Sequence, residues 1–148
     1  MNIETLTAQR EIVVDAIPAS VFTALTEPKR LLQWWGDDAS YRVTQMDHDL
    51  RPGGSVRFYG RFADGREFSA TGVYRVIDPP WVLEHTRLYG GGYPIEEETV
   101  IRYELKESDG RTLVRVLHSG FRSQEALRLH EDGWVPVLGW LREYFSKE

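Results

Sequence analysis

The fold of this chain is decided by residues 134–145, which read WVPVLGWLREYF. The large apolar side chains of this stretch recur every three or four residues, as they do along one face of an α-helix. They are Trp134, Val137, Leu138, Trp140, Leu141, Tyr144 and Phe145. This spacing predicts a long C-terminal helix that begins near Ser123 and carries a broad apolar surface.

Pro136 lies inside this expected helix. A proline there removes one backbone hydrogen bond and clashes with the preceding turn, at a cost of roughly 3 kcal/mol. Burial of Trp134 removes ~150–250 Å² from water, which stabilises the fold by roughly 4–6 kcal/mol. We therefore expect a helix that is kinked at Pro136 but not broken.

Segments upstream of the helix alternate between apolar and polar residues, and turn sequences separate them. The turns are expected at residues 51–54, 64–65, 78–80, 90–92 and 108–110. Residues 56–62 and 99–105 each place apolar side chains on one strand face and mostly polar or charged ones on the other. This pattern predicts an antiparallel meander whose apolar face the C-terminal helix must cover.

The N-terminal part is expected to hold one strand and two short helices. Residues 11–17 alternate as a half-buried strand does, and Pro18 is expected to end it. Ser20 is expected to cap the first helix. The second begins at Pro28 and is closed by Gly36.

These elements predict a single α+β domain over residues 1–148. We expect a helix-grip fold, in which a curved antiparallel sheet of about six to seven strands wraps on the long C-terminal helix. A chain of 148 residues is long enough for one core and too short for two.

Composition narrows the class of function. The net charge is −5, and acidic and basic residues are interleaved, so we expect neither nucleic acid nor a membrane surface as a partner. No residue is cysteine, which excludes disulfides and thiolate chemistry. Residues 1–10 have no apolar run after a basic start, so we expect no secretory signal, and a cytoplasmic location.

Short motifs spread along the chain resemble one known family. They are Ala19-Ser20-Val21-Phe22, Thr26-Glu27-Pro28, Trp34-Trp35-Gly36, Asp49-Leu50-Arg51-Pro52-Gly53-Gly54, Gly72, Val76-Ile77-Asp78-Pro79-Pro80, His118-Ser119-Gly120-Phe121 and Gly133-Trp134. This set resembles the homologues of the activator of heat shock protein 90 ATPase, within the START and birch-pollen-allergen-like (SRPBCC) superfamily. The resemblance implies a helix-grip fold with a cavity for apolar molecules between the sheet and the C-terminal helix.

Strand parity and the helix stripe select the residues expected to face such a cavity. They are Trp34, Trp35, Phe58, Phe62, Tyr74, His85, Tyr103, His118, Trp134 and Leu138. Dense packing is the default for protein interiors, so these side chains either enclose space or simply fill it. His118 is the candidate polar anchor for a ligand. The alternative for both inward histidines is a hydrogen bond to nearby backbone or to a tyrosine hydroxyl.

Other charged residues favour simpler explanations. Asp37 and Asp38 follow a helix-ending glycine, and residues 47–49 precede a turn, so solvated loop ends explain them and we expect no metal site and no cofactor. Glu84, Arg87 and Glu104 lie within expected strands, and we expect most of them to face water.

The preferred interpretation is a protein that binds a small apolar or aromatic ligand, and an enzyme is less favoured. One alternative is a polyketide cyclase or hydratase that uses an inward histidine and tyrosine for proton transfer. The other is a co-chaperone or stress-response module that uses an exposed apolar patch. A homodimer is left open.

Overall fold

The structure is a computed structural model that describes residues 5–90 and 97–146. Along the chain it forms β1 (Leu6–Val14), α1 (Pro18–Thr26), α2 (Pro28–Trp34), β2 (Tyr41–His48), β3 (Ser55–Phe62), β4 (Glu67–Asp78), β5 (Val82–Gly90), β6 (Thr99–Ser108), β7 (Arg111–Phe121) and α3 (Gln124–Ser146). The expected turn at residues 90–92 lies partly outside the described residues.

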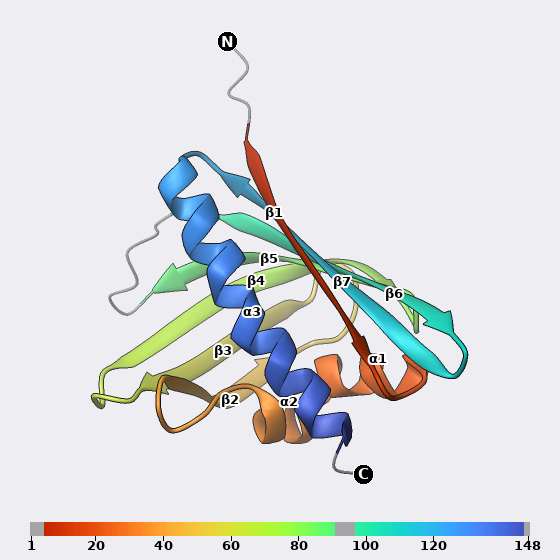
Figure 1. The fold of residues 1–148 in the computed structure, drawn as a ribbon. Helices are drawn as coiled ribbons and strands as arrows, with labels where there is room; N and C mark the ends of the chain where they lie inside the picture. Colours follow the sequence, from red (N-terminus) through yellow and green to blue (C-terminus); the bar gives the residue numbers. More distant parts are fainter. Residues whose placement is uncertain (1–4, 91–96, 147–148) are drawn as a thin grey trace.

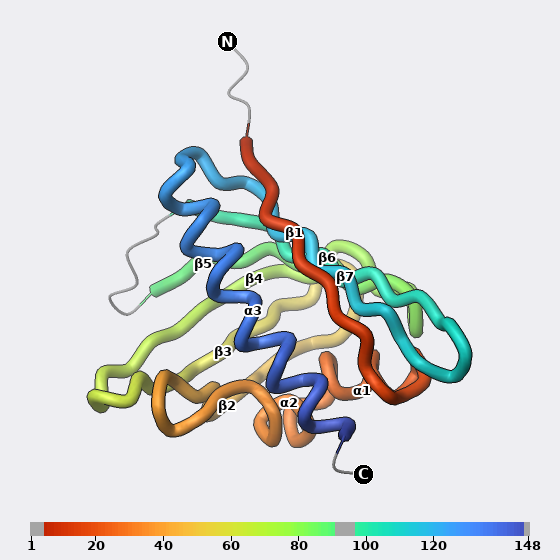
Figure 2. Tube along the Cα trace, in the orientation of Figure 1, coloured from red at the N-terminus to blue at the C-terminus, as the bar shows by residue number. Residues whose placement is uncertain are grey.

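The strands form one seven-stranded sheet in the order β1-β7-β6-β5-β4-β3-β2. Every neighbouring pair is antiparallel. The sheet curves around α3, and the two short helices lie near the C-terminal end of α3 (Figures 1 and 2). The α+β helix-grip prediction is therefore confirmed.

Helix α3 covers the inner face of the sheet. The hydroxyl of Ser123 accepts a hydrogen bond of 3.1 Å from the amide of Ala126 at the start of the helix. The helix continues through Pro136, so it is not broken there. Its buried residues are His130, Trp134, Val137, Leu138, Leu141 and Phe145. They include the core of the predicted stripe, and α3 packs against β1, β7 and α2.

The alternation predicted for the sheet is also present. Val56 and Phe58 are buried while Arg57 is exposed, and Ile101, Tyr103 and the other odd-numbered residues of 99–105 are all buried. The apolar side chains of the strands therefore meet α3 in a shared core.

Two N-terminal predictions need correction. Strand β1 begins at Leu6 and ends at Val14, earlier than the expected residues 11–17. Helix α1 begins at Pro18, with Ile17 at the N-cap, so Ser20 is inside the helix and does not cap it. Proline suits the first helical position because its fixed φ matches the helix and its missing N–H has no intrahelical partner there.

No helix in residues 5–146, leaving out 91–96, is long and apolar enough to cross a membrane.

Candidate functional site

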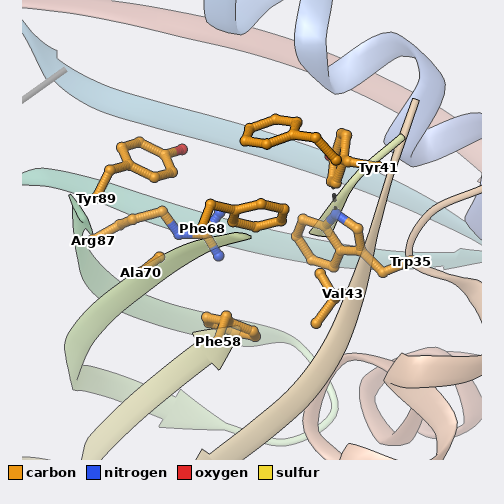
Figure 3. A pocket seen from close by; sticks show the side chains of 9 residues that line it. Trp35, Tyr41, Val43, Phe58, Phe68, Ala70, Arg87 and Tyr89 are labelled. Atoms are coloured by element: carbon orange, nitrogen blue, oxygen red, sulfur yellow. Dashed lines mark hydrogen bonds between the residues drawn. The ribbon is translucent and has the colours of Figure 1, made fainter. Parts of the chain in front are cut away.

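An inner chamber of about 170 Å³ lies against the sheet (Figure 3). Its walls come from β2, β3, β4 and β5 and from the residue that follows α2. The lining residues are Trp35, Tyr41, Val43, Phe58, Phe62, Phe68, Ala70, Arg87 and Tyr89. Most of these side chains are aromatic, so the chamber offers ring faces and edges to whatever enters it.

An outer chamber of about 350 Å³ lies between this aromatic wall and helix α3. It shares Trp35, Tyr41, Arg87 and Tyr89 with the inner chamber. The remaining lining residues are Asp37, Ser40, Leu129, His130, Gly133, Trp134, Pro136, Val137 and Trp140. Because the chambers share these walls, we describe them together as the aromatic pocket.

Two small residues in the sheet, Gly60 and Ala70, shape this space. Ala70 pairs with Phe58 on one side and with Tyr89 on the other, so a methyl group stands between two rings in the floor of the pocket. Gly60 pairs with Phe68, and a Cβ at this glycine would overlap the Phe68 ring. The sequence therefore seats one ring over Gly60 and leaves a hollow over Ala70.

Trp35 is fixed at the junction of the two chambers. Its indole donates a hydrogen bond of 3.1 Å to the hydroxyl of Tyr41. Its ring stacks on Trp34 with centroids 5.1 Å apart, and it lies 5.9 Å from the ring of Trp134 on α3. Burial raises the pKa of Tyr41, so this hydroxyl stays protonated and keeps a hydrogen to donate.

Arg87 is an exception to the expectation that most of the charged strand residues face water. Its side chain is buried, and its guanidinium carbon lies 4.9 Å from the ring centroid of Phe58, 5.6 Å from Trp35 and 5.8 Å from Tyr89. These cation–π contacts offset part of the cost of burying the charge. Glu84 and Glu104 are only partly buried and follow the expectation more closely.

His118 is a buried link between the sheet and α3. Its Nε2 lies 2.7 Å from the hydroxyl of Thr99, which in turn bonds the carbonyl of Arg87 at 3.3 Å. Its Nδ1 accepts a hydrogen bond of 3.1 Å from the indole of Trp134. Because Nδ1 is an acceptor, the proton sits on Nε2. Burial holds the pKa of His118 well below its usual value, so the ring is neutral.

Two other inward polar residues, His85 and Tyr74, also have hydrogen-bond partners. Burial lowers the pKa of His85 to about 3, and its Nδ1 lies 2.8 Å from the carbonyl of Thr86. The hydroxyl of Tyr74 bonds Nδ1 of His48 at 2.8 Å. Both groups therefore have local partners.

The structure brings only some of the expected site residues to the pocket. Trp35, Phe58 and Phe62 line the inner chamber, and Trp134 lines the outer one. The residues Trp34, Tyr74, His85, Tyr103, His118 and Leu138 are buried but line neither chamber. Ligand contact stays a prediction for all ten.

Several pocket residues were missed by the sequence analysis. Arg87 and Tyr89 alternate along β5 with Leu83 and His85, so all four side chains are expected on the inner face of the sheet. The charge of Arg87 argues for exposure, and this outweighs parity in a prediction from sequence. Ala70 was missed because a small side chain gives no apolar signal in a strand.

The acidic loop residues serve local structure. Asp37 accepts hydrogen bonds from the amide and the hydroxyl of Ser40, and Asp38 pairs with Arg42. Within residues 5–90 and 97–146, no group of three or more histidine, aspartate or glutamate side chains is placed to hold a metal ion.

The fold and the pocket define a helix-grip protein with an aromatic pocket under its C-terminal helix. Residues 15–146 match the family described as Activator of Hsp90 ATPase homolog 1-like protein, and the chain belongs to this family. A comparison with curated proteins finds no match.

Solved bacterial structures share the fold. Protein CV1439 from Chromobacterium violaceum has a TM-score of 0.83 at 18% identity, with 94% of this chain and 96% of that chain covered. A protein from Arthrobacter aurescens has a TM-score of 0.81 at 20% identity, with 100% and 90% covered. CalU16 from Micromonospora echinospora has a TM-score of 0.70 at 23% identity, with 95% and 82% covered.

Proposed function

We propose that this protein binds a small molecule with an aromatic or apolar body in the aromatic pocket. The observation that carries the proposal is the inner chamber of about 170 Å³, lined mostly by aromatic side chains. Protein interiors normally close such spaces, and an apolar cavity of about 150 Å³ is large enough to bind benzene. The inner chamber has room for about one ring, and the outer chamber extends this room toward α3.

The pairing of His118 favours binding over proton-transfer catalysis. Its two ring nitrogens are taken by Thr99 and Trp134, and it lines neither chamber. Tyr74 is paired with His48, and no hydrogen bond joins His118 to a tyrosine among the residues that the structure describes. A cyclase or hydratase that used such a pair would have to rearrange this core.

A chaperone partner, suggested by the family description, has weaker support. The exposed large apolar side chains of the described residues are spread over several elements. They are Val13, Ile17, Leu50, Val73, Trp81, Leu88, Leu129 and Val135. A docking surface would be favoured by a continuous patch, so the pocket is the stronger candidate.

Nuclear magnetic resonance with neutral probes tests the proposal. Indole, naphthalene and 2-naphthamide are titrated while the indole N–H signals of the tryptophans are followed. We expect the Trp35 signal to shift in a saturable way. Ala70→Leu, which fills the floor of the pocket, should abolish the shift, whereas Ala63→Leu in an exposed turn should keep it. Absence of a saturable shift with every probe, including the naphthoate used below, would contradict ligand binding in this pocket.

A further inference from the structure

The aromatic pocket contains a charged group that its own protein surroundings leave incompletely paired. Arg87 is 7% exposed and lines both chambers. Its Nε has no hydrogen-bond partner among the residues that the structure describes. Within residues 5–90 and 97–146, no Asp or Glu oxygen lies within 4.0 Å of its guanidinium. A buried cation without a carboxylate is costly, so this arrangement calls for a compensating group.

The surrounding rings supply only part of that compensation. Phe58, Trp35 and Tyr89 contribute cation–π contacts, and the side chain of Tyr89 also hydrogen-bonds the guanidinium. Ring contacts stabilise the positive charge but do not accept the N–H donors that lie in the plane of the group. Figure 3 shows the Arg87 guanidinium directed among the rings of the pocket.

Tyr41 provides a second donor to the same space. Its hydroxyl accepts a hydrogen bond from Trp35, and it donates to no acceptor among the residues that the structure describes. Tyr41 lines both chambers, as Arg87 does. The pocket therefore combines a fixed positive charge and a neutral donor with an otherwise aromatic wall. Arginine is suited to carboxylates because its planar donors match their two oxygens.

We propose that the ligand is an aromatic carboxylate, whose ring occupies the inner chamber and whose carboxylate binds Arg87. This inference rests on the proposed function and narrows its ligand class. One aromatic ring suits the inner chamber of about 170 Å³, and a second fused ring can extend into the adjoining outer chamber. The carboxylate supplies the acidic partner that no described residue gives Arg87. A ligand without the negative charge would leave the guanidinium without a carboxylate partner and would bind only through its apolar contacts.

Calorimetric titration of a matched probe pair tests the inference. The probes are 2-naphthoate and 2-naphthamide, which have the same ring system and differ in charge. For the unmodified protein at pH 7, we expect naphthoate to bind at least about tenfold more tightly than naphthamide, since charge-assisted hydrogen bonds are the stronger kind. Arg87→Met should remove this preference by weakening naphthoate at least about tenfold, with naphthamide changed less than about threefold.

Arg57→Met is the matched control, because Arg57 is exposed on β3 and the substitution changes the net charge by the same amount. It should leave both affinities unchanged. Equal affinity of the unmodified protein for the two probes would overturn the charge inference without any variant, so the test does not depend on the folding of Arg87→Met. Equal loss of both probes in a folded Arg87→Met protein would also overturn it. If naphthamide binds and naphthoate binds no more tightly, the proposed function stands and only the charge inference fails. If neither these two probes nor the other neutral probes bind, both proposals fail.

Discussion

The indole of Trp134 donates a hydrogen bond of 3.1 Å to Nδ1 of His118, and this bond joins helix α3 to strand β7. Nε2 of the same imidazole is hydrogen-bonded to the hydroxyl of Thr99, which donates a hydrogen bond to the backbone carbonyl of Arg87 on β5. One buried chain of polar groups thus fixes the long helix over the strand that carries the pocket arginine.

Trp134→Phe tests the strength of this link. The substitution keeps an aromatic ring but leaves Nδ1 of His118 buried without a donor, which should lower the free energy of unfolding by about 1–3 kcal/mol. Urea denaturation measures the change. Trp81→Phe is the control because Trp81 is 43% exposed, and it should have little effect. Equal effects of the two substitutions would show that the bond contributes nothing to stability.

The buried histidines predict that acid destabilises the fold. Burial lowers the pKa values of His118, His85 and His130 in the folded protein, so the unfolded chain binds more protons below its ordinary histidine pKa near 6.5. Stability is therefore present above pH 6.5 and falls as the pH drops toward the folded-state values, by at most about 1.4 kcal/mol per pH unit for each histidine.

Urea denaturation from pH 7.5 to 4.5 measures this slope. His118→Gln removes one titrating group and supplies a side-chain amide that can donate and accept hydrogen bonds. The free energy of unfolding of this variant should therefore depend less steeply on pH, by up to the contribution of one proton, about 1.4 kcal/mol per pH unit. An unchanged slope in this variant would mean that His118 is protonated in the folded protein, contrary to its pairing with Trp134.

Local patterns in the sequence are sufficient to predict the fold. The three-to-four spacing of Trp134, Leu138 and Leu141 marks one helix face, and alternation marks the inward side of each strand. These periodicities depend only on backbone geometry, so they are readable without knowing the partners. Parity was also sufficient to place His85 and His118 in the interior, where the structure finds them.

The pocket was less accessible to sequence reasoning because it depends on register. Whether a ring or a methyl group faces Phe58 is decided by the pairing of β3 with β4, which sets Ala70 opposite it. The rings around Arg87 come from β3, β5 and the end of α2, far apart in the chain. No local pattern indicates that these rings meet around one cation, so the cost of a buried charge argued for exposure.

Two alanines of similar burial should respond differently to enlargement. Ala70 is 4% exposed and faces the inner chamber, whereas Ala24 is fully buried and lines neither chamber. Ala70→Leu should cost less than about 1 kcal/mol because the added carbons enter open space, while Ala24→Leu should cost about 1–3 kcal/mol by overpacking the core. Thermal and urea denaturation of the two variants check this. Equal destabilisation would mean that the chamber is not open to side-chain atoms.

Substitution of glycine by alanine should change the free energy of unfolding in opposite directions at Gly72 and Gly139. A Cβ at Gly72 on β4 would overlap the backbone carbonyl of Thr86 on β5, which neither strand can move away without losing pairing. Gly72→Ala should therefore lower the free energy of unfolding by at least about 2 kcal/mol. A Cβ at Gly139 inside α3 would meet no atom within 4 Å. Gly139→Ala should raise the free energy by about 0.5–1 kcal/mol, because alanine loses less backbone entropy than glycine in a helix.

Urea denaturation of the two single variants and of the double variant measures both effects. Because the sites lie on different elements that share no contact, the double variant should show the sum of the two changes within about 0.5 kcal/mol. A stabilising Gly72→Ala would mean that β4 and β5 are farther apart at this position than the structure places them. A destabilising Gly139→Ala would mean that the space beside α3 is occupied, and the packing of the helix over the pocket would need revision.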